Sequence, residues 1–86
     1  MQTKFIEPAL IELDDAFEYY NLQASGLGKK LIEEVLETIE IISKYPQSYP
    51  KNTENTRKAV LRKFPYTLIY SLFKDKVYII ALAHQN

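Results

Sequence analysis

The 86-residue chain has no cysteine and no tryptophan, and it has only one histidine and two glycines. Without cysteine it can form neither a disulfide nor a thiolate zinc site, and a reducing cytoplasm suits it. With one histidine and no cysteine, any metal site would have to rest on carboxylates. We expect no metal and no other cofactor. No apolar run approaches the roughly 18 residues of a membrane span, and the opening MQTKFIEPAL has no signal-peptide core.

The chain also lacks net charge, because eleven basic and eleven acidic side chains cancel. This balance excludes a strongly basic nucleic-acid binder at the level of the whole chain. The charges are nevertheless divided: residues 1–50 hold four lysines and nine carboxylates, whereas residues 51–86 hold seven cations and two carboxylates. Two solvated surfaces of opposite sign would explain the division, and so would one basic face that receives an anion.

Apolar residues make up 47% of the chain, enough for one small globular domain. In the first half they recur at helical spacing, in two groups: Leu10, Leu13, Phe17 and Tyr20, then Leu31, Val35, Ile39 and Ile42. Between the groups, SGLG at 25–28 predicts a short turn, with Ser25 capping the second helix. The acidic residues of both helices, Glu34 among them, are assigned to the solvent-facing sides.

After Pro46 the pattern changes to short segments rich in valine, isoleucine, tyrosine and phenylalanine, which favour strands. The expected strands are 3–6, 56–64, 66–73 and 77–83, with a tight turn at 74–76. The last is apolar on both alternating faces, so we expect an interior strand covered on each side. The sequence therefore predicts a single α+β domain over residues 1–86: an N-terminal helical hairpin packed on a small antiparallel β-sheet.

Cations alternate with aromatic residues in TRKAVLRKFPYTLIYS, residues 56–71. Arginine and lysine stabilise phosphate oxygens, and aromatic rings stack on unpaired bases. The residues concerned are Arg57, Lys58, Arg62, Lys63, Tyr66 and Tyr70. Both faces of the expected strand receive both cations and apolar residues, so the sequence does not choose the working face. An edge strand that resists aggregation through its charges has the same composition.

The only histidine, His84, lies where the last expected strand ends. Its imidazole titrates near neutral pH and suits proton transfer, although a surface histidine without a role would occupy the same place. Asp14, Asp15 and Glu18 lie close enough along the first helix for two of them to share a cation. Acidic residues on an amphipathic helix usually form its solvent face, so no metal site is assigned.

Several segments, in this order, resemble the RelE/ParE superfamily of bacterial type II toxins. They are AFEYYNLQASGLGKKLIEEV at 16–35, YPQSYP at 45–50, TRKAVLRKFPYTLIY at 56–70 and ALAH at 81–84. The resemblance implies a cytoplasmic bacterial growth inhibitor of a plasmid-stabilisation system, held in a hetero-oligomer by an antitoxin encoded beside it. RelE-like members cleave messenger RNA on the ribosome without a metal ion, whereas ParE-like members inhibit DNA gyrase.

For an RNA-cleaving member the resemblance implies a role for each candidate residue. The catalytic residues would be Arg57, Arg62 and His84, as two phosphate clamps and a proton-transfer group. The substrate-binding residues would be Lys58, Lys63, Tyr66 and Tyr70.

This chain departs from the family pattern in two places. Family members usually continue past the AxxH strand end into a tail with an arginine, a proline and an aromatic pair, and this chain is expected to lack that tail. The position after Tyr66, where the nucleases commonly have a cation, is Thr67. The resemblance therefore leaves a third function open beside RNA cleavage and gyrase inhibition: a catalytically inactive member that only binds antitoxin.

Overall fold

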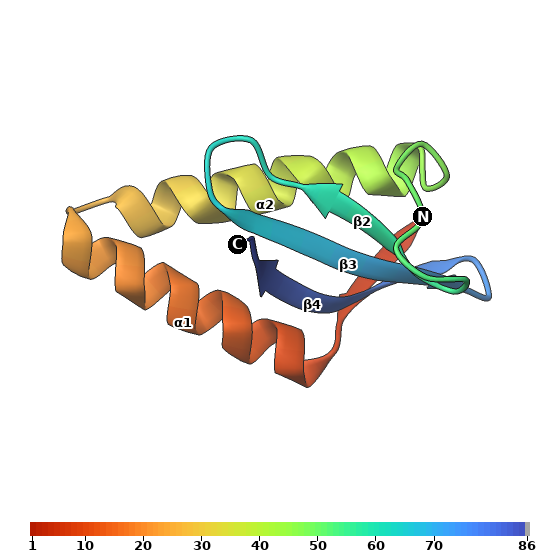
Figure 1. The fold of residues 1–86 in the computed structure, drawn as a ribbon, viewed down its shortest axis with the longest axis horizontal. Coiled ribbons are helices and arrows are strands. Elements are labelled where there is room, and N and C mark those ends of the chain that lie inside the picture. The colour runs from red at the N-terminus through yellow and green to blue at the C-terminus, as the bar shows by residue number, and fades with distance from the viewer. Residues whose placement is uncertain (86) are drawn as a thin grey trace.

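A computed structural model describes residues 1–85 as a helical hairpin packed on a four-stranded sheet (Figure 1). The elements in chain order are β1 (Gln2–Phe5), α1 (Glu7–Gln23), α2 (Leu27–Lys44), β2 (Arg57–Val60), β3 (Tyr66–Phe73) and β4 (Lys76–His84). The predicted α+β class and the helical hairpin are confirmed. The tail expected to be missing falls outside the described residues.

The turn between the helices depends on a close approach of backbone to backbone. A Cβ added to Gly28 would lie 2.6 Å from the carbonyl oxygen of Phe17, so only glycine fits where α2 begins beside α1. The backbone N–H of Gly28 donates to Oδ1 of Asn21 at 2.9 Å. The residue preceding α2 is Gly26, with φ 83° and no side-chain cap. The predicted Ser25 cap is therefore wrong, because Asn21 of the preceding helix satisfies an amide at this end.

The strands lie in the order β1-β4-β3-β2. β3 and β4 form an antiparallel hairpin in which Phe73 pairs with Lys76. The two residues between them, Lys74 and Asp75, both have positive φ, as a two-residue turn between right-twisted strands requires. β1 pairs with β4 in parallel, so the sheet is mixed rather than wholly antiparallel. Adjacent strands need not be consecutive in sequence, and here both helices, β2 and β3 separate β1 from β4.

The expected strand 56–64 is shorter in the structure, because β2 ends at Val60. Residues 61–65 form a loop that turns the chain into β3. Within it the Leu61 N–H donates to the carbonyl oxygen of Tyr66, and the Tyr66 N–H donates to that of Phe64.

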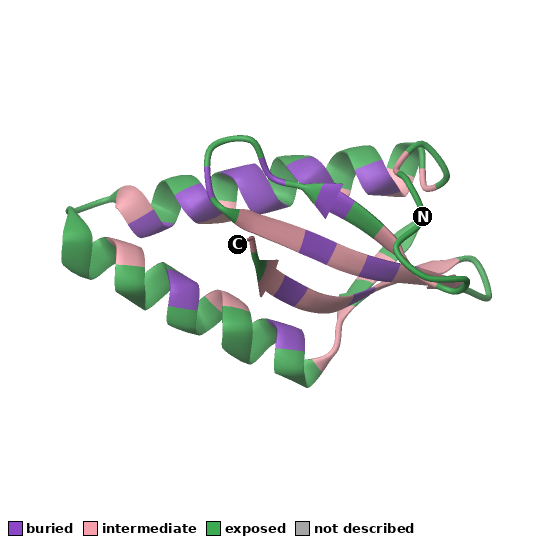
Figure 2. Cartoon of the chain, in the orientation of Figure 1, coloured by how far each residue is buried: buried purple, intermediate pink, exposed green. Residues whose placement is uncertain are grey.

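One face of the sheet forms the core with the helices. The fully buried larger side chains are Leu31, Val35, Ile42, Leu68, Tyr70, Val77 and Ile79. Figure 2 shows the buried residues along the helices and at alternate positions of the strands. The other face, which we call the outer face, is half-exposed along β3 and β4. β4 is an interior strand as predicted, but only one of its faces is fully covered, which corrects the expectation of cover on both sides.

A carboxylate of α1 covers part of the open edge of β4. The β3–β4 pairing shifts between Ile69 and Tyr70, so that Ile80 has no direct partner. Past this bulge, the backbone N–H of Leu82 donates to Oε1 of Glu12 at 3.0 Å. Glu12 thus satisfies an amide that β1 is too short to reach.

Candidate functional site

The two faces of the sheet separate the predicted site residues. Arg57 lies opposite Tyr70, and Tyr66 lies opposite His84, so these two pairs share the helix-facing side of the sheet with the core. Lys58, the next residue after Arg57, belongs to the outer face. The two pairs lie four residues apart along β3, or about 13 Å. Lys58 and His84 therefore lie on opposite faces of the sheet. Arg57 shares a face with Tyr66 and His84 but is separated from both along the length of the strands.

Arg57 and Tyr70 both hold the loop that follows α2. Nη1 of Arg57 donates to the carbonyl oxygens of Tyr49, at 2.7 Å, and Gln47, at 3.4 Å. The Tyr70 hydroxyl donates to the carbonyl oxygen of Pro46 at 2.6 Å, and its ring packs edge to face on Tyr49. Because Tyr70 is fully buried, its ring has no exposed surface on which a base could stack. We call this set of contacts the loop clamp.

Burial raises the pKa of the Tyr70 hydroxyl, and the neighbouring Arg57 guanidinium partly opposes this shift. The neutral phenol is the form that donates to Pro46. The loop clamp therefore depends on a protonated Tyr70.

Tyr66 and His84 belong to an aromatic cluster at the end of the sheet where β4 stops. Their rings meet edge to face at 5.1 Å. The Tyr20 ring of α1 lies 6.3 Å from that of Tyr66 and 4.9 Å from that of Phe64. Burial, with smaller contributions from Tyr66 and Tyr19, raises the pKa of Tyr20. His84 is exposed, whereas Tyr66 is half-buried. The His84 imidazole is therefore more accessible to a partner than the Tyr66 ring is.

Arg62 and Lys63 are held through their backbones. Oε2 of Glu34 accepts the Arg62 N–H at 2.6 Å, and Oε1 accepts the Lys63 N–H at 3.0 Å. Glu34 is only 9% exposed, and both cationic side chains are exposed. This amide clamp joins α2 to the 61–65 loop and leaves the Arg62 and Lys63 side chains available to a partner.

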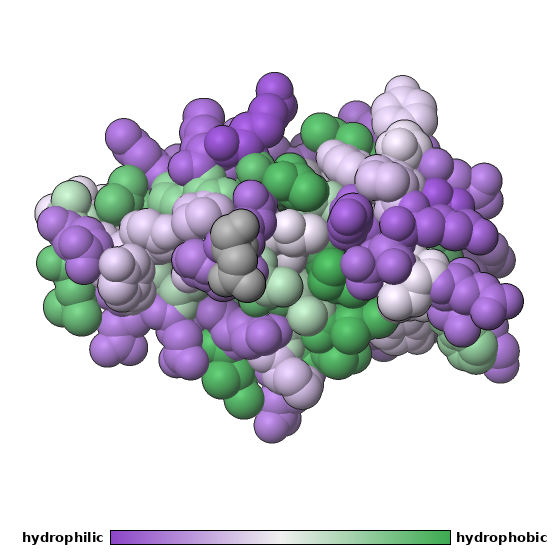
Figure 3. All heavy atoms as spheres, viewed as in Figure 1, coloured by the Kyte–Doolittle hydropathy of each residue, from purple (hydrophilic) through white to green (hydrophobic). Residues whose placement is uncertain are grey.

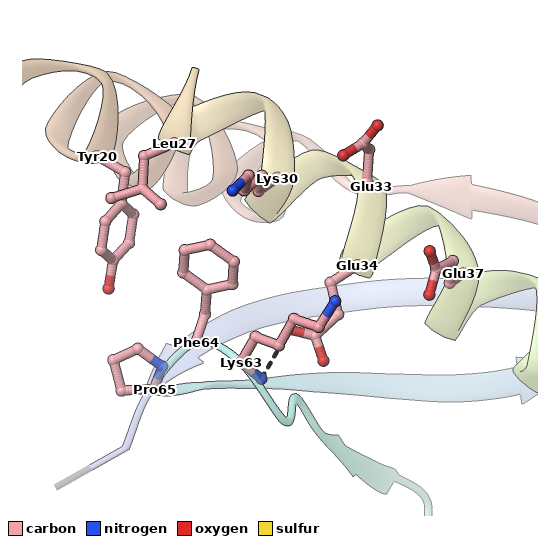
Figure 4. A pocket seen from close by; sticks show the side chains of 9 residues that line it. All are labelled: Tyr20, Leu27, Lys30, Glu33, Glu34, Glu37, Lys63, Phe64 and Pro65. Atoms are coloured by element: carbon pink, nitrogen blue, oxygen red, sulfur yellow. Dashed lines mark hydrogen bonds between the residues drawn. The ribbon is translucent and has the colours of Figure 1, made fainter. Parts of the chain in front are cut away.

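A groove runs between α2 and the 61–65 loop (Figure 4). It has a volume of about 510 Å³ and is lined by Tyr20, Leu27, Lys30, Glu33, Glu34, Glu37, Lys63, Phe64 and Pro65. Figure 4 shows the apolar side chains of Tyr20, Leu27 and Phe64 gathered at one end. Lysines and carboxylates line the rest, so the groove suits an amphipathic partner better than a small apolar molecule.

Glu34 is the residue of this region that sequence reasoning missed. It lies three residues after Leu31 and four before Thr38, both of which are buried. That spacing places it at the border of the buried side of α2. A carboxylate at such a position needs hydrogen-bond donors, but no pattern in the sequence identifies the amides of residues 62 and 63 as those donors.

Within residues 1–85, no group of three or more histidine and acidic side chains is arranged to hold a metal ion. Neither helix of this described part is long and apolar enough to cross a membrane.

One family model matches almost the whole chain. Residues 4–86 match the family model described as the ParE toxin of the type II toxin–antitoxin system parDE. This chain belongs to the ParE toxin family. It is therefore a toxin of a type II toxin–antitoxin system, as the resemblance implied. A comparison with curated protein sequences found no match.

Solved structures share the fold of this ParE-family toxin. A structure of the chromosomal ParDE system from P. aeruginosa has a TM-score of 0.86 at 14% identity, and the match covers 100% of this chain and 97% of that one. The isolated E. coli RelE toxin has a TM-score of 0.59 at 19% identity, with 99% and 84% covered. The intact E. coli RelBE toxin–antitoxin complex has a TM-score of 0.58 at 18% identity, with 99% and 96% covered. These likenesses establish the RelE/ParE fold.

Proposed function

We propose that this toxin stops growth by inhibiting DNA gyrase, as ParE-like toxins do, and not by cleaving messenger RNA. The loop clamp supports this proposal. A phosphate clamp directs its guanidinium donors at phosphate oxygens, whereas Nη1 of Arg57 is turned to two backbone carbonyls of the loop. His84 and Lys58 lie on opposite faces of the sheet, so they do not converge on one phosphate. Gyrase is a cytoplasmic enzyme, so the proposal includes a cytoplasmic location.

The proposed partner that neutralises the toxin is an antitoxin with an amphipathic helix. We propose that this helix lies in the groove between α2 and the 61–65 loop. Its apolar side chains would pack on Leu27 and Phe64, and its acidic side chains would meet Lys30 and Lys63. The two parts of the proposal are independent, because gyrase inhibition concerns free toxin.

Two assays with the purified chain test the mechanism. The first follows gyrase-catalysed supercoiling of relaxed plasmid, and the second maps cleavage of a reporter messenger RNA in a translation mixture. We expect inhibited supercoiling and intact RNA. The variants Lys58→Ala and His84→Ala should fold normally, because both side chains are exposed. They should inhibit supercoiling as strongly as the wild type, because gyrase inhibition, unlike RNA cleavage, needs neither a phosphate clamp nor a proton-transfer group.

Each other outcome contradicts part of the proposal. RNA cleavage that His84→Ala abolishes would establish the RelE-like mechanism and overturn gyrase inhibition. A chain that affects neither supercoiling nor RNA, yet still binds antitoxin, would establish the inactive antitoxin-binding member.

A matched pair of charge reversals tests the groove. Lys30 lines it, whereas its neighbour Lys29 is exposed on the same helix outside it. We expect Lys30→Glu to weaken antitoxin binding about tenfold and Lys29→Glu to change it little, measured by calorimetry with the neighbour-encoded antitoxin. Equal effects of the two reversals would remove the groove from the interface.

A further inference from the structure

The charge division of the sequence becomes a division between the layers of the fold. The two helices carry nine carboxylates and three lysines. The four strands carry Lys4, Arg57, Lys58 and Lys76 and no carboxylate. Arg57 lies on the helix-facing side, whereas Lys4, Lys58 and Lys76 alternate onto the outer face. The helical layer is therefore acidic and the outer sheet face is basic.

The outer face also presents apolar side chains to solvent. Val60 of β2 and Phe73 of β3 are 53% and 59% exposed, and Ile69 and Tyr78 between them are half-exposed. In the view of Figure 1, β2 passes in front of α2, so this face is turned towards the reader. Figure 3 shows hydrophobic residues gathered over β3 and β4 with hydrophilic residues around them. The surface is thus apolar at its centre and basic at the strand margins.

The side of α1 that points away from the sheet has the complementary character. Ile11 and Leu22 are 53% and 80% exposed. Asp14, Asp15 and Glu18 lie between them, at spacings that place all five on one side of the helix. Within residues 1–85 the one ion pair is Lys44 with Glu40 on α2, so the three carboxylates of this α1 side have no cation within 4.0 Å.

We propose that the outer sheet face of one copy binds the outward side of α1 of a second copy. Three properties of the two surfaces support this: opposite charge, exposed apolar side chains on both, and a sheet that has a helical layer on one face only. A helix laid on the bare face would complete a helix–sheet–helix arrangement. The proposal rests on the fold and not on the gyrase or antitoxin proposals.

The contact is heterologous, because each copy contributes a different surface. Every assembly still presents one free sheet face at one end and one free α1 at the other, so association continues with concentration and does not stop at a dimer. Screening by salt should weaken it, because the attraction joins exposed charges.

Charge reversal with cross-rescue tests this assignment. Lys58→Glu with Lys76→Glu makes the sheet face acidic, and Asp14→Lys with Glu18→Lys makes α1 basic. Two control variants shift the net charge by the same amounts on α2: Lys29→Glu with Lys44→Glu, and Glu33→Lys with Glu40→Lys. All would be made by cell-free synthesis, checked for folding by circular dichroism, and studied by sedimentation equilibrium.

For the wild type in about 50 mM NaCl we expect a mass-average above the 10.1 kDa monomer that rises with concentration, and a fall towards the monomer in about 500 mM NaCl. Each reversed variant should associate at least about tenfold more weakly, and an equimolar mixture of the two should regain association. Both α2 controls should behave as the wild type. A wild type that stays monomeric in low salt, a closed dimer indifferent to the reversals, or a mixture that fails to recover would overturn the proposal.

Discussion

Glu34 and Lys63 are joined across 29 residues of sequence: Oε1 of the carboxylate accepts the Lys63 backbone N–H at 3.0 Å. The other carboxylate oxygen accepts the amide of the preceding residue, Arg62. One buried acidic side chain of α2 thus fixes the loop that carries two exposed cations and, next to them, Phe64 of the groove. The shape of the proposed antitoxin groove depends on this contact.

Removing the carboxylate should destabilise the fold. We expect Glu34→Ala to lower the free energy of unfolding by about 2–4 kcal/mol, because two hydrogen bonds to a charged, nearly buried acceptor are lost. Glu34→Gln should lose less, since one side-chain oxygen remains to accept one amide. Urea unfolding followed by circular dichroism measures both. Glu33→Ala is the matched control, because Glu33 is exposed, and should stay within about 0.5 kcal/mol of the wild type. A Glu34→Ala variant with the same free energy of unfolding as the wild type would show that the amide clamp contributes nothing to stability.

Arg57 should prove structural and not catalytic. We expect Arg57→Ala to lower the free energy of unfolding by about 1.5–3 kcal/mol, because the guanidinium holds the carbonyl oxygen of Tyr49. Inhibition of gyrase per folded molecule should not change. Thermal unfolding and the supercoiling assay, corrected for the folded fraction, separate the two effects, with the exposed neighbour Lys58→Ala as control. An Arg57→Ala protein of wild-type stability that has lost toxicity would assign Arg57 to the target site instead.

The two glycines of the interhelical turn should respond differently to substitution. Gly28→Ala should cost about 1–3 kcal/mol, because its new methyl group would meet the Phe17 carbonyl oxygen. At Gly26 no atom lies within 4 Å of an added Cβ, and only its positive φ matters. Gly26→Asn should therefore change stability little, since asparagine tolerates the left-handed region. Equal stability of Gly28→Ala and the wild type in urea would show that the helices can move apart without cost.

Stability should fall in alkaline solution through the loop clamp. Burial raises the pKa of folded Tyr70 above its ordinary value near 10, so the folded state retains a proton that the unfolded state loses. The contribution of Tyr70 to the free energy of unfolding is complete below the pKa that Tyr70 has in the unfolded chain. It is lost as the pH rises through the higher pKa of Tyr70 in the folded protein. Melting temperatures measured from about pH 8 to about pH 12 should therefore fall, and less steeply in Tyr70→Phe. Tyr45→Phe, at an exposed position, should follow the wild-type curve, and a Tyr70→Phe curve as steep as the wild type would exclude Tyr70 as a source of the fall.

Tyr20 also has a raised pKa and should contribute to the same alkaline loss. For this reason Tyr70→Phe is expected to reduce the fall and not to abolish it.

Local pattern was sufficient for the secondary structure and the family. The helical spacing of Leu31 and Ile42 predicted α2, which is confirmed, and residues 66–73 form β3 as expected. The sequence predicts the first strand but not its parallel pairing with β4. The pattern of residues along a strand does not show which other strand lies beside it in the sheet. Local pattern was not sufficient for the candidate site. Arg57, Tyr70 and His84 share a face of the sheet, but Arg57 and Tyr70 bind the loop after α2, whereas His84 is exposed.

By itself, the sequence determined the α+β composition, the hairpin, the opposite charges of the two halves and the resemblance to the toxin family. These follow from apolar periodicity, turn residues and counts of charge, all of which are local or additive. Only the tertiary structure decided which face each cation occupies, which carboxylates bind amides, and that the acidic half forms the helical layer while the strands are basic. Those outcomes depend on which distant groups meet when the apolar faces are buried, and Glu34 meets residues 62 and 63 only because α2 packs beside their loop.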